Sequence, residues 1–67
     1  MKSIAKNIKI NLIEKEKDIK WLAKSLNTSP ANIYALLKNL ENGKGANIKS
    51  IEKIALVLEI KLKDLID

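Results

Sequence analysis

The chain has 67 residues, enough for one hydrophobic core, so residues 1–67 are predicted to form a single domain. It contains no Cys and no His, which excludes disulfides, thiol and imidazole chemistry and nearly all transition-metal sites. The net charge is +5 and all 13 basic residues are Lys, so a polyanion is the expected partner.

Neither an enzyme nor a membrane protein fits this composition. The carboxylates are interleaved with lysines, as on solvated helix faces, so we expect no catalytic residue, no metal and no cofactor. The apolar runs are only a few residues long, and no basic segment leads into an apolar one, so we expect a cytoplasmic protein without membrane contact. A domain this small is also expected to lack a separate pocket for a small-molecule ligand.

Two helices are predicted in the first 27 residues. A four-residue apolar spacing indicates the first, over residues 3–15, and a second stripe indicates a shorter helix that ends at Asn27. Asp18 is suited to cap the second helix, and Asn27 tolerates the left-handed backbone that reverses a chain. The two stripes are Ile4, Ile8, Leu12 and, less cleanly, Ile13, then Ile19, Leu22, Ala23 and Leu26.

Ser29-Pro30 is the clearest local signal, because Ser caps helices and Pro suits the first helical position. A third helix is therefore predicted to begin there and to end in the segment 42–45. Asn47 is predicted to cap a fourth helix, and the last residues to form a short fifth turn that closes the core. The inward stripes are Ile33, Leu36, Leu37 and Leu40, then Ile48, Ile51, Ile54, Ala55 and Leu58, then Ile60, Leu62, Leu65 and Ile66.

The second and third helices are joined by only about three residues, Leu26 to Thr28. Two short helices joined in this way are predicted to cross steeply, as in a helix-turn-helix unit over about residues 18–40. The crossing needs a small side chain, which Ala23 supplies, and a large partner, which Ile33 supplies.

At these residues the chain resembles the Cro and phage-repressor helix-turn-helix proteins, the xenobiotic-response-element or lambda-repressor-like family. The resemblance implies an all-α, compact five-helix DNA-binding domain whose helices 2 and 3 form the helix-turn-helix, and which usually binds operators as a homodimer. Ile19 departs from the Gln that many members have, and Asn27 departs from the usual Gly of the turn. The match comprises Leu22-Ala23, Thr28-Ser29, Ile33, Leu36, Ile48, Ile51, Ile54-Ala55, Leu58, Leu62 and Leu65.

The apolar stripe of the third helix is predicted to point into the core, so the opposite face of this helix is free to contact DNA. The predicted base-reading residues are Ser29, Ala31, Asn32, Tyr34, Ala35 and Lys38. The predicted phosphate contacts are Lys20, Lys24, Lys44, Asn47 and Lys49. Trp21 lies beside the buried stripe of the second helix, so we expect it to be half exposed.

The function predicted from these features is sequence-specific binding of double-stranded DNA by a transcriptional regulator. A repressor of phage, mobile-element or small-operon type, encoded by a bacterium or phage and associated with the nucleoid, fits best, with a homodimer formed through the C-terminal helices. An antitoxin or a restriction-modification controller would use the same domain. A protein-protein adaptor that keeps the helix-turn-helix shape and binds an acidic partner through its lysines is the alternative from another class.

Overall fold

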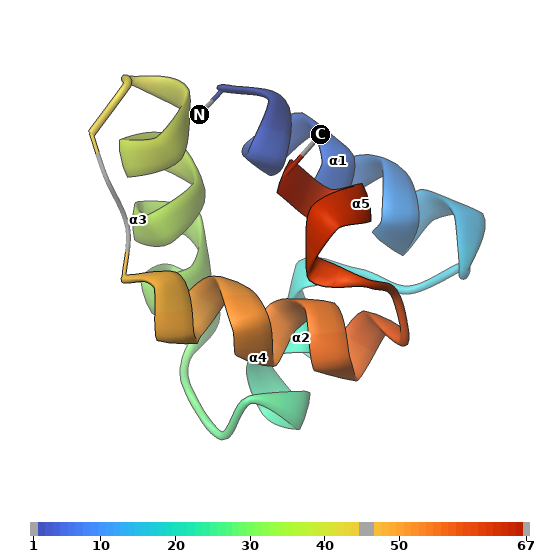
Figure 1. Cartoon of the computed structure of the whole chain (residues 1–67). Helices are drawn as coiled ribbons and strands as arrows, with labels where there is room; N and C mark the ends of the chain where they lie inside the picture. Colours follow the sequence, from blue (N-terminus) through green and yellow to red (C-terminus); the bar gives the residue numbers. More distant parts are fainter. Residues whose placement is uncertain (1, 45–46, 67) are drawn as a thin grey trace.

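Five helices account for most of the chain in the computed structural model, which describes residues 2–44 and 47–66. They are α1 (Lys2–Glu14), α2 (Ile19–Ser25), α3 (Pro30–Glu41), α4 (Ile48–Leu58) and α5 (Leu62–Ile66). No strand occurs in the described residues, so the predicted all-α class is confirmed. Figure 1 shows α1 and α5 side by side at one end of the molecule, with α3 and α4 enclosing the other side.

Side-chain caps fix the starts of the three central helices. Asp18 accepts a hydrogen bond from the backbone N–H of Trp21 at 2.8 Å, and Ser29 accepts one from Asn32 at 3.3 Å. Asn47 accepts one from the N–H of Lys49 at 2.9 Å. Each bond satisfies an N–H that a helix start leaves without an intrahelical partner, so all three predicted caps are confirmed.

Helices α1, α2 and α4 are each followed by a residue in the left-handed backbone region. These residues are Glu16, Asn27 and Glu59, with φ angles of 57°, 56° and 58°. The left-handed turn lets a later N–H reach back to a carbonyl of the last helical turn, as Ile60 does to Ala55 at 3.0 Å. Asn27 therefore reverses the chain as predicted, whereas Glu16 and Glu59 adopt a conformation that costs more for their residue type.

The core is a single aliphatic cluster drawn from all five helices. Asn7 extends it at one edge, donating a hydrogen bond to the carbonyl of Leu65 at 2.8 Å and so joining α1 to α5. No described polar or charged side chain is buried, so burial of apolar surface is the main stabilising term. The buried side chains are Ile4, Ala5, Ile8, Leu12, Leu22, Ala23, Ile33, Leu37, Leu40, Ile51, Ile54, Ala55, Leu58 and Leu65.

Several side chains of the predicted stripes lie at the surface instead. Ile13 is 74% exposed and Ile48 is 49% exposed, so their assignment to the core is wrong. In α1 the buried face is completed by Ala5, which the spacing argument missed because Ala marks a helix face weakly. Ile48 is the first residue of α4 and lies a turn before the helix meets the core. Ile66 is also exposed, and Gly45 of the predicted loop lies outside the described residues.

The left-handed Glu59 gives a stability test with a matched control in the same helix. Glu59→Gly is expected to raise the free energy of unfolding by about 1 kcal/mol, because Gly adopts this conformation without a steric penalty. Glu52→Gly, an exposed change inside α4, is expected to lower it by about 1 kcal/mol. Urea unfolding followed by Trp21 fluorescence measures both. Equal losses of stability would contradict the role of Glu59 as the helix terminator.

Candidate nucleic-acid interface

A corner of four residues, 26–29, joins α2 to α3. The N–H of Leu26 donates to the carbonyl of Leu22 at 3.0 Å, and the N–H of Thr28 donates to that of Ala23 at 2.9 Å. Asn27 lies between them with a left-handed backbone, so the chain leaves α2 in a new direction and α3 begins at once. The predicted turn between two short helices is confirmed.

Close packing at this corner depends on Ala23, which is only 1% exposed. Leu22 beside it and Ile33 of α3 are also buried, and α2 and α3 are in extensive contact. A small side chain at the contact lets the two backbones approach closely while Leu22 and Ile33 fill the space around them. The corner therefore sets the position of α3 on the domain.

The face of α3 opposite its buried stripe is open to solvent. Ala31, Ala35 and Lys38 follow one another at intervals of four and three residues, so they lie along one side of the helix. All three are exposed, whereas Ile33 and Leu37 on the opposite side are buried. Ser29, Asn32 and Tyr34 are exposed as well, so the six predicted base-reading residues all reach the surface.

These six residues do not form one flat face. Tyr34 is turned toward α1, where its ring lines an apolar groove of about 350 Å³ together with Ile13 and Ile19. Asn32 is on the other flank of α3, and its side-chain N–H donates to the hydroxyl oxygen of Thr28 at 2.8 Å. The centre of the exposed face therefore carries two small apolar side chains, Ala31 and Ala35, with Tyr34 on one flank and Asn32 on the other.

The predicted phosphate residues divide into two groups around α3. Lys20 and Lys24 line an open cleft between α2 and the start of α3, together with Asn27, Thr28 and Pro30. Lys44, Asn47 and Lys49 belong to the α3–α4 connection and the start of α4, and all are exposed. The side-chain oxygen of Asn47 is taken by the cap of α4, so its amide N–H groups are the part left for a ligand.

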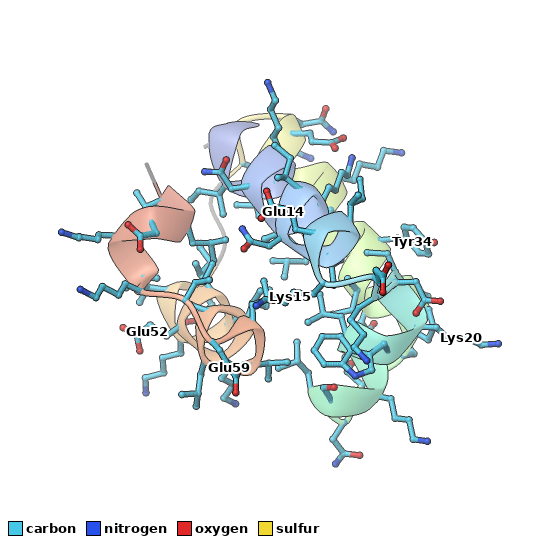
Figure 2. The ribbon with its side chains drawn as sticks, turned by 90° about the vertical axis from the view of Figure 1, so that its right-hand side faces the viewer. Glu14, Lys15, Lys20, Tyr34, Glu52 and Glu59 are labelled. Carbon is cyan, nitrogen blue, oxygen red and sulfur yellow. The ribbon has the colours of Figure 1, made fainter. Side chains whose placement is uncertain are left out.

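Charge is distributed unevenly around the molecule. Figure 2 shows Tyr34 and Lys20 projecting from one side, while Glu52 and Glu59 of α4 lie on the side away from them. Glu41, at the end of α3, forms an ion pair with Lys9 of α1. Glu41 is thus at the C-terminal end of α3, and Asp18 lines the groove beside Tyr34, while Lys20 and Lys24 border the start of α3.

Sequence reasoning missed two features of this surface. A cleft of about 230 Å³ between α3 and α4 is lined on its polar side by Thr28, Asn32, Ser50 and Lys53. Lys53 is not among the residues predicted to contact phosphate, and no sequence signal tied it to α3. At the start of α2, the ammonium group of Lys17 lies 5.5 Å from the ring centre of Trp21, which is half buried as predicted.

A family model described as the Cro/C1-type HTH DNA-binding domain matches residues 7–67. The chain belongs to this family. No curated protein and no solved structure gives a significant match.

Membership assigns the Cro/C1-type domain to DNA-binding regulators, which are generally not enzymes. Within residues 2–44 and 47–66, no helix has the length and apolar character needed to cross a membrane. In the same residues, no three His, Cys, Asp or Glu side chains come together as metal ligands would. The five-helix arrangement agrees with the family and carries the helix-turn-helix on α2 and α3.

The corner generates a stability prediction with two alanines as a matched pair. Ala23→Leu is expected to lower the free energy of unfolding by about 1–3 kcal/mol, because the added methyl groups overfill the contact between α2 and α3. Ala35→Leu, on the exposed side of α3, is expected to change it by no more than about 0.5 kcal/mol. Thermal unfolding followed by circular dichroism compares the two. A larger loss for Ala35→Leu would mean that the faces of α3 are assigned wrongly.

Proposed function

We propose that this domain is a sequence-specific, double-stranded DNA-binding transcriptional regulator, a repressor of phage, mobile-element or small-operon type that acts on bacterial nucleoid DNA. In this proposal α3 lies in the major groove. Ser29, Ala31, Asn32, Tyr34, Ala35 and Lys38 contact bases or the adjoining backbone. The antitoxin and restriction-controller variants differ in the genes served and not in the contacts with DNA.

The observation that carries the proposal is the exposed N-terminal half of α3, which itself contains no carboxylate and is bordered by Lys20 and Lys24. An α-helix fits the major groove, which is about 12 Å wide, only where nothing else on the domain projects past it. Ala31 and Ala35 allow close approach and suit the methyl groups of thymines, and the chain has no Arg, the commonest reader of guanine. We therefore propose an operator with many A·T pairs at the positions under α3.

Phosphate contacts supply most of the affinity in this proposal. Lys20 and Lys24 border α3 on one side, and Lys44, Asn47 and Lys49 border it on the other. If two protomers neutralise about eight phosphates, affinity falls by about four decades between 50 and 200 mM salt. A salt dependence of this size distinguishes a regulator that contacts many DNA phosphates from a protein that binds DNA weakly through scattered lysines.

A homodimer is proposed to form through the C-terminal helices. Leu56 of α4 is 78% exposed and Ile66 of α5 is 43% exposed, while Ile60 and Leu62 between them are half buried. A second copy packed against α4 and α5 would remove these side chains from water. Two protomers would then present two α3 helices to successive half-sites.

A protein-protein adaptor remains the second candidate, and the groove between α1 and α3 favours it. Its apolar lining includes Ile13, Ile19 and Tyr34, and Lys9 and Lys17 lie at its rim. An acidic partner with an apolar side chain would suit this groove. On this hypothesis duplex DNA binds weakly and without sequence preference.

Selection from a random duplex pool distinguishes the two functions. The regulator hypothesis predicts enrichment of a palindromic, A·T-rich motif whose half-sites are about one helical turn apart. Competition with unrelated duplex DNA at 150 mM salt then measures the specificity. A pool whose sequences stay random after repeated rounds would refute the regulator hypothesis and favour the adaptor hypothesis.

Two exposed residues of α3 test the contact surface itself. Tyr34→Ala and Lys38→Ala are each expected to weaken binding to the selected duplex by about 1–3 kcal/mol and to leave thermal unfolding nearly unchanged. Lys6→Ala, an exposed change on α1, serves as the charge-matched control. If Tyr34→Ala unfolded the domain, the exposed assignment of that side of α3 would be incorrect.

The dimer surface is tested by a charge placed on its most exposed apolar residue. Leu56→Glu is expected to shift sedimentation toward the monomer and to weaken operator binding without loss of fold, since Leu56 is not part of the core. Ile13→Glu makes the same change at the equally exposed outer face of α1 and is expected to leave the oligomeric state unchanged. The reverse pattern would move the interface to α1.

A further inference from the structure

The cleft between α3 and α4 presents several hydrogen-bond donors next to an apolar floor. Thr28 and Asn32 border it from the helix-turn-helix, and Ser50 and Lys53 border it from α4. Its volume of about 230 Å³ is several times the ~30 Å³ share of one water molecule in the liquid, so a phosphate oxygen and its hydration water fit at the mouth. The floor consists of Leu26, Ile33, Leu36 and Ile54.

The charge of this cleft is purely positive. Lys53 is the one charged residue in its lining, and no carboxylate borders it. Among the described residues the one ion pair joins Lys9 to Glu41, so Lys53 is not neutralised by a neighbouring acid. The groove on the opposite flank of α3 differs, because Asp18 lies in its lining.

The hydroxyl and amide groups are oriented by a local contact. The side-chain N–H of Asn32 donates to the hydroxyl oxygen of Thr28, which leaves the Thr28 O–H to donate elsewhere. The second N–H of Asn32, the Ser50 hydroxyl and the Lys53 ammonium are further donors around the same opening. Several donors around one opening, with no acidic group among them, match the oxygens of a phosphate diester.

A helix in the major groove has a phosphate strand on each side. On the α2 side of α3, Lys20 and Lys24 border the first strand. We propose that the α3–α4 cleft seats a phosphate of the second strand, with Lys53 as its main charge contact and Ser50 and Asn32 as hydrogen-bond donors. This inference rests on the proposed function and adds to it two α4 residues that sequence reasoning did not assign.

Lys53→Ala, measured against the selected duplex, tests the contact. Loss of one phosphate contact per protomer is expected to reduce the slope of log affinity against log salt by about 0.9 per protomer, which is about 1.8 for a dimer, and to weaken binding about fivefold per protomer at 0.15 M salt. The loss is expected to be similar for cognate and mutated operators, because a phosphate contact carries no sequence information. Lys53→Arg is expected to retain most of the affinity.

Lys15→Ala is the matched control. Lys15 is an exposed lysine in the link between α1 and α2, which lies on the right of Figure 1, whereas α3 lies on the left. Its removal is expected to leave the salt slope unchanged. Circular dichroism of each variant confirms that the fold is intact, and Lys53→Gln provides a second neutral variant if Lys53→Ala does not fold.

A duplex with one uncharged methylphosphonate linkage gives the sharpest readout. When the methylphosphonate replaces the phosphate seated in the cleft, wild type and Lys53→Ala are expected to bind the duplex with equal affinity. When it replaces any other phosphate, the difference in affinity between the two proteins is expected to persist. Equal affinity and slope for Lys53→Ala and Lys15→Ala would overturn this inference and leave the proposed function standing. Failure of the wild-type chain to bind any duplex would overturn both.

Discussion

The position of α3 depends on the contact between Ala23 and the residues packed around it. Thr28 donates its N–H to the carbonyl of Ala23, and Leu22, Ala23 and Ile33 are all buried in the one core cluster. Asn27 supplies the left-handed backbone that turns the chain between them. Because this corner is short and packed, α3 has little freedom relative to α2, and its outer face is presented as a rigid surface.

The rest of the surface is organised around that helix. Lysines border the N-terminal half of α3 on the α2 side and on the α4 side, while Glu52 and Glu59 lie away from Tyr34 and Lys20 (Figure 2). These lysines attract a polyanion toward the exposed face of α3. Tyr34 is the large exposed apolar side chain of α3, whereas Ile10 and Ile13 lie on α1 and Leu56 and Ile66 on the α4–α5 segment, where protein contacts rather than DNA contacts are expected.

Much of the fold could be predicted from local signals. Asp18, Ser29 and Asn47 cap helices, and the apolar spacing places nearly all of the core, because both depend on residues close in sequence. Ile13 and Ile48 were assigned wrongly, since periodicity near a helix end does not tell which side the neighbouring helices cover. The cleft containing Lys53 could not be predicted, because it exists only once α4 packs beside the start of α3. The DNA contacts themselves remain predictions.

Nuclear magnetic resonance of the isotope-labelled chain, titrated with a selected duplex, shows which face of the domain meets DNA. The largest shift changes are expected at Ala31, Asn32 and Ala35, on the outer face of α3, with small changes at buried Ile8 and Leu65. Changes concentrated on Ile10 and Ile13 of α1, with Ala31 and Ala35 unaffected, would contradict the claim that the corner presents α3 to DNA.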